Sequence, residues 1–325
     1  MAPRTTQFLV ESFLARLKEA QPTGNTPMLA NRQARTDILM KTAKVSRPLT
    51  IHLEEPLILE GDALTVLRRL PDQCVQCLVT SPPYWGLRDY NIKDQIGHEP
   101  TLPQFIIRLC TVFAEAKRVL KDDGIFWLNI GDGYTSGNRG WRAPDKKNRA
   151  RAMDVRPDTP ERLKPKDLLG IPWRLAFALQ DDGWYLRADI VWNKPNAQPE
   201  SVKDRPTRAH EYLFMFTKSE RYYYDRQAVL EPNGRNCRSV WNIHTQRCPG
   251  AHFATFPPKL IEPCIQASSR SGDFVLDPFF GSGTVGVVAQ QLKRRYVGIE
   301  LHPDYVTMAA QRLQTDEGKI IRIAA

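Results

Sequence analysis

The sequence predicts an α/β fold: a mixed sheet of the Rossmann-like type with helices on both faces and an antiparallel hairpin at one edge. Three observations lead to this prediction. Short runs rich in β-forming residues alternate with segments whose apolar residues recur at three- and four-residue spacing, the pattern of strands connected by helices. A glycine-rich turn over 281–286 follows an apolar run and precedes a helical segment. Two runs within 211–225 are joined by a short polar turn, which is typical of a hairpin.

The elements follow in chain order from Leu57 onward. The clearest helix is 102–120, where Leu102, Ile106, Leu109 and Phe113 lie on one helical face. The β-rich runs that we predict as strands are 57–60, 75–80, 125–130, 186–192, 211–217, 274–277 and 296–300. The predicted helices between them are 63–70, 102–120, 173–181, 258–268, 284–293 and 303–314.

Composition restricts the class of protein. A chain of 325 residues with 42% hydrophobic residues is large enough for a substantial globular core and is not a disordered or fibrous sequence. No apolar run approaches the ~20 residues of a membrane-spanning helix, and the first residues lack a signal peptide's apolar centre. We therefore expect a cytoplasmic protein without membrane association. The net charge of +10 favours a polyanionic partner.

Three segments depart from the alternation. Residues 1–50 are rich in Lys and Arg with one amphipathic stretch over 8–17, and we interpret them as a basic helical N-terminal arm preceding a folded domain over 51–325. Residues 138–166 are strongly basic, and residues 231–250 are polar with isolated Trp and Cys. We interpret both as surface insertions. The basic one is either a solvated loop or an arm that neutralises phosphates.

The segment DPFFGSGTVG, residues 277–286, has the features of a cofactor loop. Its glycines stand at a strand-to-helix turn, where a ligand can approach the backbone and the helix amino end. Glu300 ends the following strand, at the distance expected for a carboxylate that holds ribose hydroxyls. Nicotinamide, flavin and S-adenosylmethionine sites all use this geometry. Asp277 within the turn favours a cationic or amino ligand over a pyrophosphate.

The segment TSPPYW, residues 80–85, ends the strand 75–80. Pro82 and Pro83 fix the backbone and remove two donors, which leaves carbonyl groups free to accept hydrogen bonds. Ser81 adds a hydroxyl and Tyr84 a flat aromatic face. This combination suits a planar, amine-bearing group, although residue types alone favour a rigid surface turn.

Together these motifs resemble those of the DNA amino-methyltransferases, which methylate an exocyclic base nitrogen using S-adenosylmethionine. TSPPY is similar to their catalytic motif and DPFFGSGT to their cofactor motif. The catalytic motif comes first, as in the permuted order of the β group. The resemblance covers roughly residues 55–315 and includes GDAL (61–64), IFWLNIGD (125–132), DIVWNKPN (189–196), RPTRAHEYLFMFTKS (205–219) and HFATFPPKL (252–260). It implies the class I methyltransferase fold, with 51–325 as the catalytic domain.

The resemblance also assigns roles. The catalytic residues would be Ser81, Pro82, Pro83 and Tyr84: the serine and the following carbonyl accept hydrogen bonds from the amine, and the tyrosine stacks on a base that has been flipped out of the duplex. Those holding S-adenosylmethionine would be Asp277, Phe279, Gly281, Ser282, Gly283, Thr284, Glu300, Asp62, Pro257 and Lys259. Some relatives carry an acidic residue at the position of Asn129. Here either Asp132 substitutes as proton acceptor or the reaction requires no base.

Ser at position 81, where the adenine-N6 enzymes usually carry Asp, favours cytosine N4 as the methylated atom. Adenine N6 is the alternative. Two other classes stay open: an NAD-dependent oxidoreductase using the GSGTVG loop, and a nucleic-acid-binding protein without activity. The expected partner is double-stranded DNA, contacted through 138–166 and 231–250. A restriction-modification system with a cognate endonuclease is the expected context, in a bacterium, archaeon or phage, for a monomer or homodimer associated with the nucleoid.

Several other groups of residues give weaker evidence of a functional site. We predict no metal site, although Cys237, His244, Cys248 and His252 provide four potential ligands at a spacing that matches no common zinc finger. The pair Cys74 and Cys77 lacks a second pair, and Cys264 lies in an apolar-periodic helix and is expected to be a core residue. His210 and Glu211 adjoin on a strand and so point to opposite faces, and the aromatic run 222–224 is interpreted as an edge strand.

Overall fold

The computed structural model describes residues 51–90, 92–136, 157–246, 256–314 and 319–323. The chain divides into two units, Met1–Pro48 and Leu49–Ala325, and all described residues belong to the second. The predicted arm 1–50 therefore lies outside the described residues. Among the described helices, none has both the length and the apolar character needed to cross a membrane.

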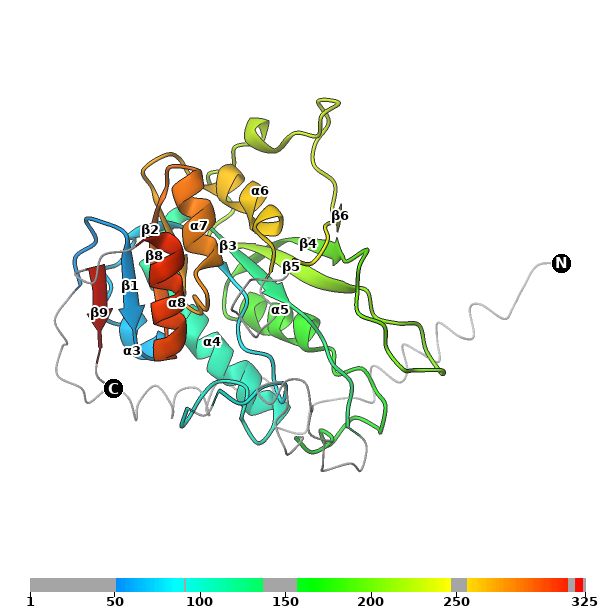
Figure 1. Ribbon diagram of the computed structural model, residues 1–325. Helices are drawn as coiled ribbons and strands as arrows, with labels where there is room; N and C mark the ends of the chain where they lie inside the picture. Colours follow the sequence, from blue (N-terminus) through cyan, green and yellow to red (C-terminus); the bar gives the residue numbers. More distant parts are fainter. Residues whose placement is uncertain (1–50, 91, 137–156, 247–255, 315–318, 324–325) are drawn as a thin grey trace, which may run out of the picture. The chain divides into compact units, whose positions relative to one another are not determined.

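In the described part of this unit, nine strands form a central mixed sheet in the order β6-β4-β5-β3-β2-β7-β8-β1-β9. Strand β5 runs antiparallel to β3 and β4, whereas the other pairings are parallel. Figure 1 shows the strands. Their bounds are β1 Leu57–Glu60, β2 Val75–Thr80, β3 Leu120–Ile130, β4 Tyr185–Asn193, β5 His210–Thr217, β6 Val240–Asn242, β7 Phe274–Asp277, β8 Arg295–Glu300 and β9 Ile320–Arg322.

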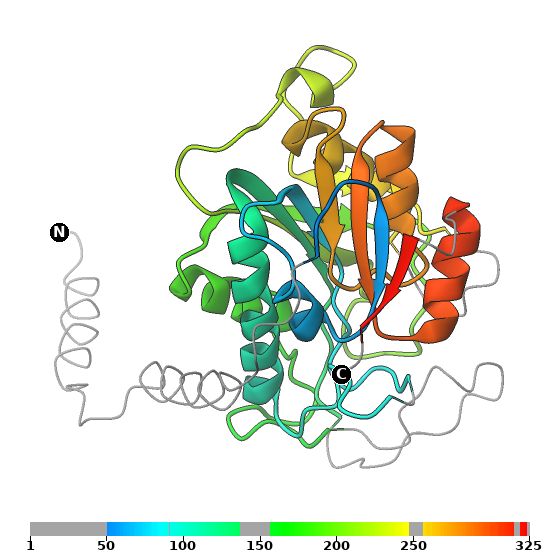
Figure 2. The same cartoon turned by 90° about the vertical axis from the view of Figure 1, so that its left-hand side faces the viewer.

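Helices cover both faces of the sheet. Residues of α3, α4 and α5 pack into one buried cluster and those of α6, α7 and α8 into another. The cyan and green helices in Figure 2 lie on one side of the sheet and the orange and red helices on the other. Their bounds are α3 Ala63–Leu67, α4 Leu102–Val119, α5 Ile171–Asp181, α6 Pro258–Ser268, α7 Thr284–Gln291 and α8 Pro303–Leu313, with a 3₁₀ turn, η2, over Gln227–Val229. This arrangement confirms the predicted fold class.

Helix α4 shows how local sequence sets an element. Thr101 and Gln104 form a capping box, in which each side chain accepts from the other residue's backbone N–H, a device that stabilises a helix start by about 1 kcal/mol. Lys117 and Arg118 lie in its last turn, where cations complement the helix dipole. Its apolar stripe buries Phe113 against Phe126 of β3, with ring centroids 4.8 Å apart.

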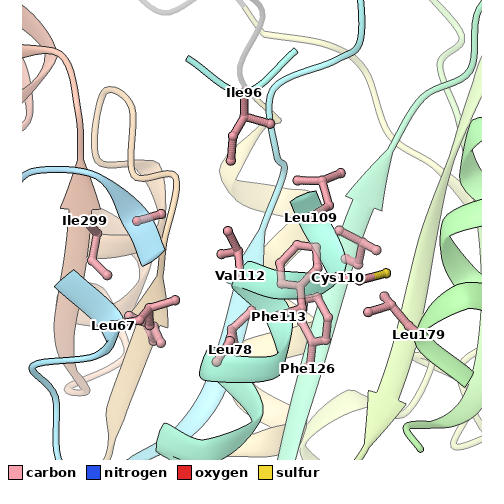
Figure 3. Close-up of a cluster of buried hydrophobic side chains, with 14 of the residues drawn as sticks. Leu67, Leu78, Ile96, Leu109, Cys110, Val112, Phe113, Phe126, Leu179 and Ile299 are labelled. Atoms are coloured by element: carbon pink, nitrogen blue, oxygen red, sulfur yellow. The ribbon is translucent and has the colours of Figure 1, made fainter. Parts of the chain in front are cut away.

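The core on this face joins α3, α4 and α5 to the sheet. Figure 3 shows Leu67 of α3 and Leu179 of α5 flanking the α4 side chains, which lie over Leu78 and Phe126. Each such side chain, fully buried, stabilises the fold by about 1.5–3 kcal/mol. The sheet positions are thereby fixed, and the loops that follow its strands start from rigid points.

The strand directions bring several chain segments to one edge of the sheet. The carboxyl ends of the parallel strands β1, β2, β7 and β8 share this edge, and the reversed direction of β5 places its first residues there too. In open α/β sheets ligands bind outside the carboxyl ends of the strands. The two motifs singled out in the sequence follow β2 and β7 and therefore meet.

The structure corrects one detail of the prediction and adds two strands. The antiparallel pair near the sheet edge consists of β4 and β5, whereas residues 222–225, expected as the second run of the hairpin, form no strand. They pack instead along α6, where the Asp225 N–H donates to the Ala267 carbonyl. Strands β6 and β9 were not predicted, since each has only three residues. Strand β6 lies within the predicted insertion 231–250.

Candidate active site

A large cavity opens at the carboxyl edge of the sheet, with a volume of about 1210 Å³. The loop after β2, the loop after β7, the end of β8 and the connection between β4 and β5 all contribute to its wall. Of the residues predicted as functional, the cavity is lined by Asp62, Ser81, Pro82, Pro83, Tyr84, Asp277, Phe279, Gly281, Ser282, Thr284 and Glu300.

Thr80 and Asp277 join the two motifs beneath this cavity. The Thr80 hydroxyl donates to Asp277 Oδ1 at 2.6 Å, and the Phe279 N–H donates to the same oxygen at 3.0 Å. Asp277 is only 2% exposed, and this burial raises its pKa to about 7 despite the two donors. A buried carboxylate of this kind is stabilised by a cationic ligand.

Glu300 holds the glycine loop from the neighbouring strand. Its Oε2 accepts from the Gly281 N–H and its Oε1 from the His302 N–H, both at 2.7 Å. Burial raises the pKa of Glu300 to about 7, and the backbone donors oppose that rise. Each carboxylate oxygen has a second lone pair, so the side chain can accept further hydrogen bonds from a ligand in the cavity.

The glycine loop needs its glycines for two different reasons. Gly281 has φ +51° and no heavy atom within 4 Å of the position of a Cβ, so its outer side is open. Gly283 has φ +78°, and its Cβ would lie 3.0 Å from that of Ala309. Arg312 of α8 fastens the loop from behind, since its Nη1 donates to the Ser282 carbonyl, the Ser282 hydroxyl and the Thr284 hydroxyl at 2.7, 2.9 and 3.3 Å.

Tyr84 continues the catalytic motif into the cavity. Its hydroxyl donates to Glu211 Oε2 at 3.0 Å. Burial, followed by the nearby Glu211 carboxylate, raises the Tyr84 pKa well above its usual value, so the hydroxyl keeps its proton. Asp62 also lines the cavity, and its Oδ1 caps α3 by accepting from the Thr65 N–H and hydroxyl, both at 2.9 Å.

Comparison with known proteins decides the family. Residues 75–311 match the model of the N6/N4 methyltransferase family, described as DNA methylase. The chain belongs to this family. It is 70% identical over 286 residues to type II methyltransferase M.XycI of Xanthomonas campestris pv. cyanopsidis, covering 87% of this chain and 95% of the relative. It is 68% identical over 299 residues to M.Cfr9I of Citrobacter freundii, covering 88% and 100%.

Solved structures agree on the fold of this DNA methyltransferase. TTHA0409 of Thermus thermophilus, complexed with S-adenosyl-L-methionine, superposes with a TM-score of 0.60 at 25% identity, covering 83% of this chain and 99% of that one. The cytosine-N4-specific PvuII DNA methyltransferase superposes with a TM-score of 0.61, covering 79% and 88%. Its 23% identity shows the fold alone. Because the chain belongs to the DNA methylase family, it is neither the NAD-dependent oxidoreductase nor the nucleic-acid-binding protein without activity that the sequence left open.

Asp132, considered from the sequence as a proton acceptor, is hydrogen-bonded to backbone groups away from the cavity. Its carboxylate accepts from the backbone N–H groups of Gly133, Gly170 and Ile171 at 2.9, 3.1 and 3.0 Å, so it holds the start of α5. It does not line the cavity. Asn129 donates from Nδ2 to Glu211 Oε2 at 3.2 Å and to the Tyr212 carbonyl at 3.1 Å. With these contacts made, neither side chain is placed as a proton acceptor.

Three predicted cofactor residues lie outside the wall of the cavity. Gly283 turns toward α8, as described above. Pro257 caps the start of α6 and Lys259 lies in its first turn, and neither lines the cavity. Their neighbour Phe256 does line it. A role for Pro257 and Lys259 toward the cofactor therefore stays a prediction.

The buried cysteines Cys77 and Cys264 are structural. Burial raises the pKa of Cys77 to about 12 and that of Cys264 well above its usual value, so neither thiol is reactive at neutral pH. Within the described residues no three His, Cys, Asp or Glu side chains form a metal-binding group. Cys248 and His252, two of the four ligands considered earlier, lie outside the described residues.

Two further candidate residues, Glu211 and Arg312, were not predicted from the sequence. The pairing of His210 with Glu211 was discounted, but Glu211 itself lines the cavity and contacts three other elements. Arg312 lies in the last turn of α8, far along the chain from the loop that it holds. A long-range contact of this kind has no local sequence signal.

Proposed function

We propose that this DNA methyltransferase transfers a methyl group from S-adenosylmethionine to the N4 amino group of a cytosine flipped out of double-stranded DNA. The observation that carries the proposal is the Thr80–Asp277 hydrogen bond of 2.6 Å. It holds the TSPPY loop and the glycine loop at adjacent strand ends, so that an acceptor for the base and a site for the cofactor open into one cavity.

The residues present fit S-adenosylmethionine. Its sulfonium and ammonium groups are positive, and the cavity offers two carboxylates, Asp277 and Glu300, whose pKa values burial has raised to about 7. A cation relieves the cost of ionising such groups. Gly281 leaves its backbone open to a close approach. We assign Asp277, Phe279 and the glycine loop to the methionine part and Glu300 to the ribose. The cofactor supplies a methyl group activated by the positive sulfur.

The protein's task is to prepare the amine. The exocyclic nitrogen is a weak nucleophile because its lone pair is delocalised into the ring. The Ser81 hydroxyl and the Pro82 carbonyl accept its two hydrogens, which favours a tetrahedral nitrogen and frees the lone pair. Tyr84 stacks on the base and holds it in line for transfer. The base reaches this loop only when it is flipped from the helix.

Cytosine is favoured over adenine by the residue at position 81. A serine hydroxyl is shorter than the aspartate of the usual adenine enzymes, and it carries no charge. The test is direct: DNA methylated by the purified enzyme is digested to nucleosides, and the modified one is identified by mass spectrometry. N4-Methylcytosine supports the proposal, whereas N6-methyladenine would assign the alternative substrate.

We propose a restriction-modification role because M.XycI and M.Cfr9I are type II methyltransferases. Sequencing that detects modified bases in enzyme-treated genomic DNA would give the recognition sequence. The prediction is methylation confined to one short motif and protection of that motif from an endonuclease cutting there. Methylation without a consensus sequence would contradict this role.

The basic segment 138–166 and the segment 231–250 remain our candidates for DNA contact. Neutralising the Lys and Arg residues of 138–166 should flatten the dependence of DNA affinity on salt, because each lost phosphate contact removes one released counterion. Affinity for S-adenosylhomocysteine should stay unchanged. An unaltered salt slope would exclude this segment as a phosphate contact.

A further inference from the structure

Glu211 accepts hydrogen bonds from three elements around the base-binding side of the cavity. Its Oε2 accepts from the Tyr84 hydroxyl at 3.0 Å and from Asn129 Nδ2 at 3.2 Å. Its Oε1 accepts from Lys194 Nζ at 2.5 Å. These donors follow β2, lie within β3 and follow β4. One carboxylate at the start of β5 therefore ties together three strand ends that the chain connects only through long segments.

The surroundings leave Tyr84 little room. A Cβ on Gly131 would lie 2.9 Å from Tyr84 Cε2 and 3.2 Å from Glu211 Cδ, so the glycine lets the ring and the carboxylate pack directly against the chain after β3. Beside the carboxylate, Lys194 Nζ lies 4.3 Å from the centroid of the Trp192 ring. Lys194, Trp192 and Glu211 all line the cavity.

The charges of Glu211 and its neighbours stabilise the hydrogen bond from Tyr84. Lys194 and Glu211 form an ion pair whose side chains are 18% and 17% exposed, so the largely buried carboxylate has a cationic partner. The raised pKa of Tyr84 keeps its hydroxyl protonated. A charge-assisted hydrogen bond from a neutral donor to a carboxylate is about twice as strong as one between neutral groups. The tyrosine is thus held by its tip as well as by its backbone.

We propose that Glu211 is a positioning residue for methyl transfer: through the Tyr84 hydroxyl it fixes the plane of the ring against which the target base stacks. The proposal rests on the function proposed above, in which Tyr84 faces the base. A tyrosine attached only at its backbone can turn about two side-chain bonds. With its hydroxyl bound it presents one face, and small misplacements of reacting groups are costly in rate.

Variants at the two positions test whether Glu211 acts through the tyrosine hydroxyl. Glu211→Ala removes the acceptor, whereas Glu211→Gln keeps an amide oxygen that can still accept from Tyr84. We expect Glu211→Ala to lower the single-turnover rate of methyl transfer about tenfold or more, and Glu211→Gln to recover most of that loss. In a Tyr84→Phe background the hydroxyl is absent, so Glu211→Gln should have no advantage over Glu211→Ala.

The same variants should leave affinity for S-adenosylhomocysteine unchanged, because the carboxylate does not touch the glycine loop. An advantage of Gln over Ala that persists in the Tyr84→Phe background would overturn the proposal, since Glu211 would then act through Lys194 or Asn129. If Glu211→Ala does not fold, Glu211→Leu, which also lacks the acceptor, takes its place in a cycle with Tyr84→Phe and the double variant. Independent, multiplicative losses in that cycle would equally overturn it.

Matched controls separate this effect from general damage. Tyr222→Phe removes a hydroxyl that accepts from Arg187, and Glu115→Gln weakens an ion pair with Arg118 on α4. Neither residue lines the cavity, so both variants should keep the wild-type rate. Failure of the proposed function is seen separately, as an absence of N4-methylcytosine in DNA treated with the wild-type enzyme. If the wild-type enzyme makes N4-methylcytosine but the Glu211 and Tyr84 variants show no coupling, only the positioning role of Glu211 is refuted.

Discussion

The Thr80 hydroxyl donates to Asp277 Oδ1 at 2.6 Å, across two neighbouring strands that are far apart in the chain. The residue after Thr80 is the serine proposed to bind the amine, and the residues after Asp277 form the glycine loop. Because both groups are buried, their hydrogen bond is protected from water. It fixes the TSPPY loop relative to the glycine loop, the segments proposed to bind the base and the cofactor.

Thr80→Val tests this hydrogen bond. The change keeps the shape of the side chain and removes its donor, which costs about 1–3 kcal/mol when a buried acceptor loses its partner. Since the Thr80 bond lowers the pKa of Asp277, that pKa should rise in the variant, and binding of S-adenosylhomocysteine at pH 7 should weaken. Calorimetric titration measures the loss. Thr111→Val, which removes a buried hydroxyl within α4, should leave binding unchanged.

Cofactor affinity should depend on pH through Asp277 and Glu300. Both pKa values lie near 7 in the free protein. A cation beside Asp277 and ribose hydroxyls that donate to Glu300 would both favour the ionised carboxylates. Affinity should therefore rise between about pH 6 and about pH 8. Asp277→Asn should weaken binding about tenfold at the upper end and reduce the slope. Titration of both proteins with S-adenosylmethionine at several pH values checks this prediction. A wild-type affinity that does not change with pH would refute it.

The same carboxylates should affect stability in the opposite sense. The folded pKa of Asp277 lies near 7, above the unfolded value of about 3.9. The protonated side chain thus stabilises the fold below about pH 4, and this contribution is lost as pH rises through about 7. The melting temperature of the ligand-free protein should fall less between these limits in Asp277→Asn than in the wild type. Equal slopes would contradict the assignment.

Two glycines near the cofactor loop should respond differently to alanine. Gly281→Ala meets open space but adopts a left-handed backbone, at a cost of about 1–2 kcal/mol, and extends a methyl group toward the cofactor. It should lose affinity for S-adenosylhomocysteine with a modest loss of stability. Gly298→Ala would place its Cβ 2.3 Å from the Phe280 ring, so its larger effect should be on the melting temperature. The reverse ranking would be inconsistent with this packing.

Arg312 should support cofactor binding without contacting the cofactor cavity. It holds Ser282 and Thr284 from behind and does not line the cavity. Arg312→Met keeps the stem of the side chain and removes the donors, so affinity for S-adenosylhomocysteine should fall several-fold. Arg312→Lys should recover part of this affinity, because its ammonium group can still donate to the loop. An unchanged affinity in Arg312→Met would show that the glycine loop keeps its conformation without Arg312.

Much of the fold and of the site was accessible from the sequence. Strands 57–60, 75–80 and 274–277 were predicted with the observed bounds, because buried parallel strands are apolar along their length. The two loops could be singled out because each combines special backbone residues with polar groups at a strand end, and their predicted roles came from the resemblance to the DNA amino-methyltransferases. The expected second run at 222–225 was wrong because aromatic content alone does not distinguish a strand from a segment packed on a helix.

The remainder depends on contacts between distant segments. Glu211 reaches Tyr84 across 127 positions, and a local pattern carries no information on such a pair. Asp132 has the acidic character of a proton acceptor, yet the structure uses it to satisfy the backbone N–H groups at the start of α5. The short strands β6 and β9 exist only because neighbouring strands offer unpaired edges.

Ser81 is the proposed hydrogen-bond acceptor for a cytosine amine in a cavity shared with S-adenosylmethionine. A single-turnover assay of methyl transfer to duplex DNA, run on wild type and Ser81→Ala together with a titration of S-adenosylhomocysteine, tests this role most directly. We expect the rate of Ser81→Ala to fall by about a hundredfold or more, with unchanged affinity for S-adenosylhomocysteine. An undiminished rate at intact cofactor binding would contradict it.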